Sequence, residues 1–172
     1  MYNSLTLPYP NSFFITQGIG VGKSELVAFD DALIQAKISN YNLVKISSIL
    51  PKRAVQQLHK ISLTEGSILP TAYATVSSKS KGDILATAIA VGIPKDPNSV
   101  GVIMENHSRL YSQPSLLENI TKELEKETIE MVNQAMENHK IAIETVICKA
   151  QSVCIETSDN TWTSLISAIC IW

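Results

Sequence analysis

Charged residues are scarce in this sequence. Only 17% of its 172 residues are Asp, Glu, Lys or Arg, and 14 basic residues nearly balance 16 acidic ones, for a net charge of -2. A protein that binds nucleic acid needs a basic surface to neutralise phosphates, so this composition argues against nucleic acid as a partner. We expect a small molecule or another protein to be the partner instead.

Cysteine is also sparse. Cys148, Cys154 and Cys170 are an odd number, and their spacing matches neither a CxxC pair nor a zinc ribbon. All three stand among apolar residues, so we interpret them as reduced thiols of the core and expect no metal site. Reduced thiols are typical of the cytoplasm, where we expect the protein to reside.

Long apolar runs are missing as well. No stretch reaches the 18 apolar residues of a membrane-spanning helix, and the first residues lack a basic segment followed by a long apolar block. We therefore expect no membrane partner. Apolar residues still make up 45% of the sequence, and no linker or repeat interrupts it, so residues 1–172 are expected to form one domain with a substantial core.

Hydrophobic periodicity predicts two helices. The first is expected over residues 24–38, with Ser24 as its N-cap. The second is expected over residues 115–139, with a capping box formed by Ser115 and Glu118. The apolar faces are expected to comprise Leu26, Phe29, Leu33 and Ala36 in the first helix, and Leu117, Ile120, Leu124, Met131 and Ala135 in the second.

About six strands are expected between and after these helices. Runs rich in β-branched and apolar residues, separated by Gly, Pro and Asp turn signals, indicate them. Strands interleaved with two helices predict a layered domain of the α+β class. The expected strands are 42–46, 71–78, 84–93, 100–105, 141–154 and 162–172.

The glycine-rich stretch Gly18-Ile19-Gly20-Val21-Gly22-Lys23-Ser24 is similar to the end of a nucleotide-binding phosphate loop. That motif needs four residues between its two glycines, and the position that should match Gly22 is Gln17, so the spacing fails by one residue. We interpret the stretch as a flexible turn that leads into the first helix, with Lys23 in solvent. Nucleotide binding is kept as a weaker alternative.

Two further features could carry chemistry. Glu105 ends the apolar strand 100–105, and because burial disfavours a charged carboxylate, this group could hold a proton and act as a general acid. A solvated edge residue is the alternative reading of Glu105. Ser47 and Ser48 follow the strand 42–46, and a serine hydroxyl can attack the preceding carbonyl carbon if the backbone at a tight strand end is held bent.

Five stretches occur in order along the chain: Ala28-Phe29-Asp30-Asp31-Ala32-Leu33, Asn42-Leu43-Val44-Lys45-Ile46-Ser47-Ser48-Ile49-Leu50-Pro51, Leu69-Pro70-Thr71-Ala72-Tyr73, Ile93-Pro94-Lys95-Asp96 and Gly101-Val102-Ile103-Met104-Glu105. In order and spacing, over about residues 25–106, they resemble the pyruvoyl-dependent arginine decarboxylases. The long second helix and the final strand that ends in Trp172 fit the remainder. Five stretches in register are far more specific than any one of them.

The resemblance implies that the chain cuts itself between Ser47 and Ser48, giving a β chain 1–47 and an α chain 48–172. Residue 48 would become a covalent pyruvoyl group, so neither a metal nor pyridoxal phosphate is implied. By this resemblance, the group would serve as an electron sink for decarboxylation of L-arginine to agmatine and CO2. Glu105 would then return a proton to the α-carbon of the product.

The resemblance also implies substrate contacts. Asn42 would assist the cut and orient the substrate, and Asp30 would bind the guanidinium group through paired hydrogen bonds. Backbone carbonyls near Ser39 and Tyr41 would help. Related enzymes are four-layer αββα sandwiches of mixed sheets and form trimers with the active site between neighbouring subunits, so we expect a homotrimer here.

Two other hypotheses stay open beside arginine decarboxylation. One is pyruvoyl chemistry on another amino acid, of which histidine is the nearest precedent. The other is an uncut homologue that acts as a binding or structural subunit rather than an enzyme. The presence of both Ser48 and Asn42 argues against the second hypothesis.

Overall fold

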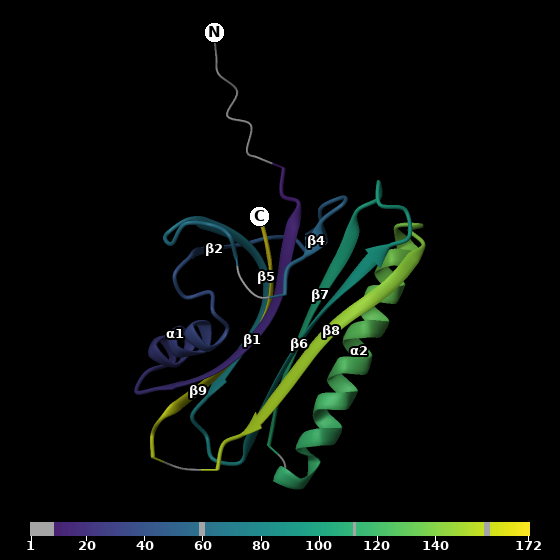
Figure 1. Cartoon of the computed structure of the whole chain (residues 1–172). Helices are drawn as coiled ribbons and strands as arrows, with labels where there is room; N and C mark the ends of the chain where they lie inside the picture. Colours follow the sequence, from purple (N-terminus) through teal and green to yellow (C-terminus); the bar gives the residue numbers. More distant parts are fainter. Residues whose placement is uncertain (1–8, 59–60, 112, 157–158) are drawn as a thin grey trace.

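The computed structural model describes residues 9–58, 61–111, 113–156 and 159–172. Two β-sheets pack face to face in it, with helix α1 (Glu25–Gln35) against the first sheet and helix α2 (Leu117–Asn138) against the second (Figure 1). The arrangement is compatible with a sandwich. The α+β class expected from the sequence is confirmed.

The first sheet is mixed. Its strand order is β2-β5-β9-β1-β4, in which β2 runs parallel to β5, β4 runs parallel to β1, and the other pairs are antiparallel. Three long strands, β5, β9 and β1, thus lie between two short edge strands from the residues on either side of the serine pair. The strands are β1 (Ser12–Gly22), β2 (Asn42–Lys45), β4 (Val55–Gln56), β5 (Ile68–Ser78) and β9 (Trp162–Ile171).

The second sheet is antiparallel throughout. Its strand order is β3-β7-β6-β8, and the pairing of β6 with β8 shifts register between Ile93 and Pro94. The strands are β3 (Ile49–Leu50), β6 (Asp83–Pro94), β7 (Gly101–Tyr111) and β8 (Ile143–Cys154).

The main core lies between the two sheets. Ile89 and Val91 of β6 pack there against Phe13 of the first sheet, whereas the intervening Ala90 faces Val132 of α2. Strand β6 is therefore covered on both sides, as its alternation of large and small residues predicts. The small residues leave room for the helix, and the large ones fill the space between the sheets.

Helix α1 begins as predicted, because the Ser24 hydroxyl accepts a hydrogen bond from the Val27 N–H at 3.3 Å. The predicted flexible turn before it is wrong. The glycines belong to β1, and a Cβ on Gly20 would lie 2.1 Å from the backbone nitrogen of Ala32. Glycine is needed at these positions so that the helix can approach the strand closely.

The same close approach corrects the expected apolar face of α1 at Leu26, whereas Phe29, Leu33 and Ala36 contribute to the core as predicted. Ala28 and Ala32 are fully buried against the glycines of β1, whereas Leu26 is 76% exposed. Large side chains cannot fit between a helix and a strand whose backbones nearly touch. Leu26 was wrongly included, and Ala28 and Ala32 were missed, because the partner surface consists of backbone rather than side chains.

Helix α2 also differs from the prediction at its start. Residues Pro114–Leu116 form a turn of 3-10 helix, and Leu116 precedes α2 without a side-chain capping bond, so the capping box at Ser115 is wrong. The buried face includes Leu124, as predicted, but continues through Thr128, Val132 and Met136. Met131 is 37% exposed. Within the described residues, neither helix has the length and apolar composition that crossing a membrane requires.

Candidate active site

The serine pair lies where the chain crosses from one sheet to the other. Before the crossing, the Ile46 N–H donates to the Thr71 carbonyl of the first sheet at 3.2 Å. After it, the Ser48 carbonyl accepts a hydrogen bond from the Ile103 N–H of the second sheet at 2.8 Å. The sharp strand end expected at this point is therefore confirmed, and the backbone is fixed on both sides of Ser47.

Ser48 has an unusual backbone conformation. Its φ is 65°, in the left-handed region that residues other than glycine rarely adopt. Such a conformation costs roughly 1–3 kcal/mol and persists only where surrounding contacts hold it. The half-buried Ser48 hydroxyl donates a hydrogen bond of 2.9 Å to Oε2 of Glu105. A strained residue whose hydroxyl bonds to a carboxylate is the candidate reactive centre.

Glu105 lies within β7 and not at its end. The strand predicted over residues 100–105 continues to Tyr111, because β7 pairs with β6 along its whole length and its polar second half can face solvent. Glu105 is opposite Ile89, a residue of the core between the sheets. In the part of the chain that the structure describes, no Lys, Arg or His side chain forms an ion pair with this carboxylate.

Asn42 lies apart from this pair. It is the first residue of β2 and exposed, and its side-chain amide donates to the carbonyl of Gly66 at 2.6 Å. Its amide group therefore faces the loop before β5 and not the serine hydroxyl. Within one chain, the structure joins Ser48 to Glu105 but leaves Asn42 outside their hydrogen bonds.

The three residues expected to bind substrate are also divided. Ser39 and Tyr41 line a hollow of about 500 Å³ together with Lys37 and Glu65, beside the end of α1. The Tyr41 hydroxyl points to the carbonyl of Leu63 at 3.4 Å. Asp30 is exposed on α1 and is not part of this lining. A single chain thus does not assemble the expected substrate contacts around Ser48.

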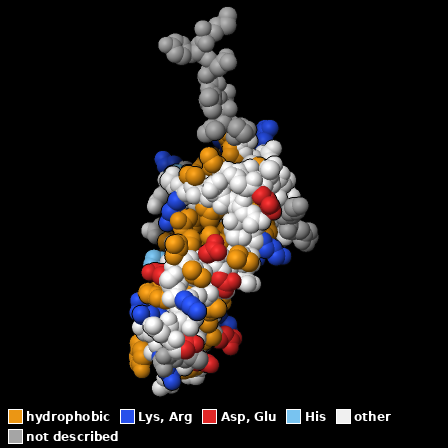
Figure 2. Space-filling view, turned by 90° about the vertical axis from the view of Figure 1, so that its left-hand side faces the viewer, with side chains coloured by type: hydrophobic (Ala, Val, Ile, Leu, Met, Phe, Trp, Pro, Cys, Tyr) orange, Lys and Arg blue, Asp and Glu red, His pale blue; other side chains and the backbone are white. Residues whose placement is uncertain are grey.

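The face formed by α1 and β2 carries many exposed apolar side chains. Figure 2 shows hydrophobic groups interspersed over this side of the molecule. Leu26, Val27 and Ile34 of α1 are exposed by half or more, and Val44 of β2 by 47%. Asp30 and Asn42 lie on these same two elements.

The glycine-rich stretch does not resemble a phosphate loop in three dimensions. Residues 18–22 are extended and paired with β9, so their N–H groups do not converge on one point. The Val21 N–H donates to the Asp31 carboxylate at 2.9 Å. This bond ties β1 to α1, and Lys23 is exposed as expected.

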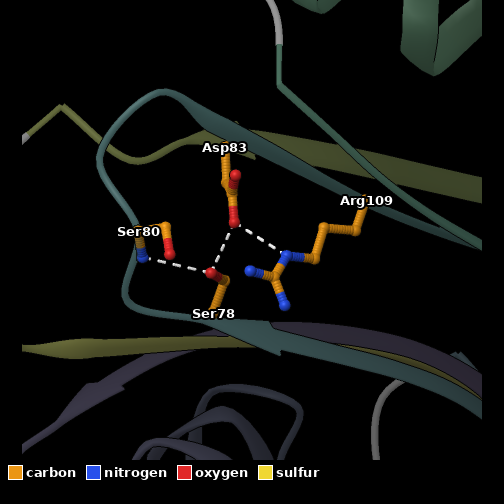
Figure 3. Close-up of polar contacts among 4 residues, drawn as sticks. All are labelled: Ser78, Ser80, Asp83 and Arg109. Atoms are coloured by element: carbon orange, nitrogen blue, oxygen red, sulfur yellow. Dashed lines mark hydrogen bonds and ion pairs between the residues drawn. The ribbon is translucent and has the colours of Figure 1, made fainter.

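A second serine–carboxylate contact lies at the turn between β5 and β6. The Ser78 hydroxyl donates to Oδ2 of Asp83 at 2.5 Å, and the Arg109 Nε–H donates to the same oxygen at 2.7 Å (Figure 3). The Ser80 N–H donates to the Ser78 hydroxyl at 3.1 Å. Asp83 is buried, and its charge is neutralised by Arg109, so this cluster joins the turn to β7.

The cysteines are all free thiols, but only Cys170 is fully buried, whereas Cys148 and Cys154 are half-buried. Burial raises the pKa of the Cys170 thiol to about 12, against the lowering effect of a hydrogen bond from Thr71. Burial also raises the pKa of Cys148 to about 12, and the nearby charge of Glu125 adds to it. Both thiols therefore stay protonated and unreactive near neutral pH.

Several parts of this site left no signal in the sequence. The N–H of Ile103, which holds the Ser48 carbonyl, is a backbone group that any residue except proline provides. The Arg109 partner of Asp83 is 26 residues away, and only strand pairing brings the two together. Side-chain motifs located the serine pair and Glu105, whereas their backbone support became visible only in the fold.

Comparison with known proteins identifies relatives that cover most of the chain. The family described as pyruvoyl-dependent arginine decarboxylase matches residues 12–172. A protein with that name from Methanococcus vannielii is 41% identical over 123 residues, which cover 71% of this chain and 73% of the relative. Another from Methanocaldococcus jannaschii is 35% identical over 142 residues, 81% of this chain and 84% of the relative.

A third relative, from Methanococcus aeolicus, carries the same name and is 38% identical over 152 residues, 87% of this chain and 86% of the relative. The matched residues include the crossing with Ser48 and the strand with Glu105. The resemblance expected from five short stretches is confirmed. The chain therefore belongs to the family of pyruvoyl-dependent arginine decarboxylases.

Proposed function

We propose that this protein decarboxylates L-arginine to agmatine and CO2 after cutting itself between Ser47 and Ser48. The observation that carries the proposal is the left-handed backbone of Ser48 combined with the hydrogen bond of its hydroxyl to Glu105. Family membership supplies the substrate class, and the strained serine supplies a reason why the cut would fall at this peptide bond.

The cut begins with an attack of the Ser48 Oγ on the carbonyl carbon of Ser47. The amide C–N bond breaks, the nitrogen takes up the hydroxyl proton, and an ester joins the two chains. Loss of the Ser48 Cα proton with cleavage of its Cβ–Oγ bond then releases the carboxylate of Ser47 and leaves dehydroalanine. Addition of water and departure of ammonia convert residue 48 into a pyruvoyl group.

The described residues fit such a group. Residue 48 is held at its carbonyl by the Ile103 N–H and lies within hydrogen-bonding distance of Glu105. A pyruvoyl group there would supply a carbonyl that takes up the substrate's amine and accepts the electrons left by departing CO2. Glu105 would return the proton that the α-carbon needs, because its carboxyl group lies beside residue 48.

The remaining site residues are proposed to act across a subunit boundary. Asp30 would accept paired hydrogen bonds from the guanidinium group, carbonyls near Ser39 and Tyr41 would support it, and Asn42 would orient the substrate. These residues lie apart from Ser48 in one chain, on a face with exposed apolar side chains. A trimer of four-layer αββα subunits would bury that face and complete the site.

The test measures the mass of the purified protein under denaturing conditions, with and without a carbonyl-reactive reagent, and then agmatine formation from arginine. Two chains, 1–47 and 48–172, with the reagent attached to the larger one, are the expected result. One intact chain that persists through days of incubation and mild heating would overturn the proposal and favour an uncut binding homologue.

Substrate identity needs its own comparison. The Asp30→Asn variant should lose most activity on arginine and little on histidine, which has no guanidinium group. The exposed Asp159 serves as a control site, with Asp159→Asn expected to keep wild-type activity. A wild-type enzyme that turns over histidine faster than arginine would contradict the assignment of substrate.

A further inference from the structure

The segment that follows the cleavage site is anchored by a very short strand. Strand β3 has two residues, Ile49 and Leu50, which pair with Val102 and Gly101 of β7. Strands in globular proteins are usually 3–10 residues long, and shorter pairings give little stability by themselves. Further contacts are needed to hold residue 48 in its left-handed conformation.

Arg53 makes such a contact. Its Nη2 donates a hydrogen bond of 2.6 Å to Oδ1 of Asn98 in the loop between β6 and β7. Asn98 is in turn fixed by Asp96, whose Oδ1 accepts from the Asn98 backbone N–H at 2.9 Å and from its side-chain amide at 3.1 Å. The acceptor that Arg53 binds is therefore held in place and correctly oriented.

The position of this contact continues the pairing of β3 with β7. Leu50 is opposite Gly101 in the antiparallel pair. Arg53 comes three residues after Leu50, and its partner Asn98 comes three residues before Gly101, so the contact lies where the next pairs of the ladder would be. The side chains thus connect the two segments beyond the point where their backbones separate. Gly101 permits the close pairing, because a Cβ there would lie 2.5 Å from the carbonyl oxygen of Gly92 and 3.1 Å from Leu50.

Arg53 is also strained, with a φ of 60°. Two left-handed residues other than glycine, Ser48 and Arg53, therefore stand at the two ends of a six-residue segment. Each such conformation costs roughly 1–3 kcal/mol and relaxes unless contacts prevent it. Release of Arg53 from Asn98 would let the segment relax, and the strain at Ser48 could then be lost.

We propose that the Arg53–Asn98 contact is a latch that holds Ser48 in its reactive conformation, with Arg53 as a positioning residue for self-cleavage. This inference rests on the self-cleavage proposed above. The latch does not touch the peptide bond that is cut. It acts through Leu50 and the paired backbone of Gly101, which fix where the Ser48 carbonyl and hydroxyl lie.

The chain offers a matched contact for comparison. The Lys79 ammonium group donates to Oδ1 of Asn160 at 3.2 Å, and Asn160 is left-handed with a φ of 63°. Both contacts are exposed, and both join a cation to an asparagine of a loop. Lys79 follows the end of β5, whereas the crossing at Ser48 contacts the opposite end of that strand near Thr71.

The experiment follows the cutting of freshly synthesised precursor by denaturing mass spectrometry in five proteins: wild type, Arg53→Ala, Asn98→Ala, Arg53→Lys and Lys79→Ala. We expect the two alanine variants of the latch to be cut about tenfold more slowly than wild type. Lys79→Ala should match wild type. Arg53→Lys should recover much of the rate, because an ammonium group can also donate to Asn98.

A purely structural effect is separated by measuring Tm for each variant in a Ser48→Ala background, which cannot be cut. The latch variants and Lys79→Ala should lower Tm by similar small amounts while differing in cutting rate. The double variant Arg53→Ala/Asn98→Ala should be no slower than either single variant, because one contact is lost in all three.

Three results would overturn the inference. Latch variants cut at the wild-type rate would show that Ser48 keeps its conformation without Arg53. A slow rate that follows Tm across all variants, Lys79→Ala included, would show general destabilisation. If the wild-type chain is not cut at all, the self-cleavage proposal fails, and the latch proposal fails with it. If the wild-type chain is cut and the latch variants are cut equally fast, only the latch proposal fails.

Discussion

The molecule contains two contacts of the same chemical kind in different settings. Ser48 donates to Glu105 at 2.9 Å from a left-handed backbone, and no described cation pairs with that carboxylate. Ser78 donates to Asp83 at 2.5 Å from the end of a regular strand, and Arg109 neutralises the acid. A serine beside a carboxylate is therefore not a sufficient sign of reactivity. Backbone strain and an unpaired acid distinguish the candidate centre from the structural one.

The largest expected effect comes from removing the two serine hydroxyls one at a time. Ser48→Ala should abolish both self-cleavage and decarboxylation, because the attacking oxygen and the precursor of the pyruvoyl group are lost together. Ser78→Ala should still be cut into chains 1–47 and 48–172. Denaturing mass spectrometry shows whether each variant is one chain or two. A Ser48→Ala protein that is still cut would place the reactive residue elsewhere.

The second largest effect is expected from replacing Glu105, the carboxylate beside Ser48. Glu105→Gln should lower kcat for arginine by about 10²–10⁴-fold, the usual contribution of a positioned proton donor. Self-cleavage should continue, since the amide oxygen of Gln can still accept the Ser48 hydrogen bond. Agmatine formation per pyruvoyl group, titrated with a carbonyl reagent, measures the loss. A kcat equal to that of wild type would remove Glu105 from the proton transfer.

The third prediction concerns Arg109, which pairs with Asp83 in the second serine–carboxylate contact. Arg109→Met should leave the buried Asp83 carboxylate without its cation, which costs about 2 kcal/mol for a group still bonded to Ser78. Thermal unfolding of the uncut Ser48→Ala background should show a Tm lower by several degrees. An unchanged Tm would mean that the half-exposed Arg109 contributes little to stability, and that the contrast between the two contacts rests on backbone conformation alone.

The smallest expected effect is on the stability of Ser78→Ala. Loss of the hydrogen bond to Asp83 and of the one from the Ser80 N–H costs about 1.5 kcal/mol while Arg109 remains in place. Urea unfolding in the same uncut background would show a midpoint slightly below that of the parent. A loss larger than that of Arg109→Met would reverse the assigned importance of the two partners of Asp83.

The sequence correctly predicted features that depend on residues close together in the chain. Ser24 was correctly identified as a cap because its hydroxyl bonds within one turn, and the serine pair was correctly placed at a strand end followed by Pro51. The α+β class followed from alternating periodicities. These features need only a few neighbouring residues.

Features that depend on distant partners could not be predicted in the same way. The glycines of β1 resembled a turn because nothing near them in sequence shows that α1 lies against them. Leu26 was wrongly assigned to the buried face of α1 for the same reason. The polar half of β7 ended the predicted strand too early, although pairing with β6 extends it to Tyr111.

The place of β1 in the first sheet has a consequence for the products of the proposed cut. Strands β1 and β2 belong to residues 1–47, but β1 lies between β9 and β4, and β2 pairs with β5, all of which belong to residues 48–172. The two products would thus remain interleaved through a shared ladder of backbone hydrogen bonds. The two chains would still fold as one cooperative unit. Its refolding from denaturant would become a second-order reaction whose rate rises with protein concentration.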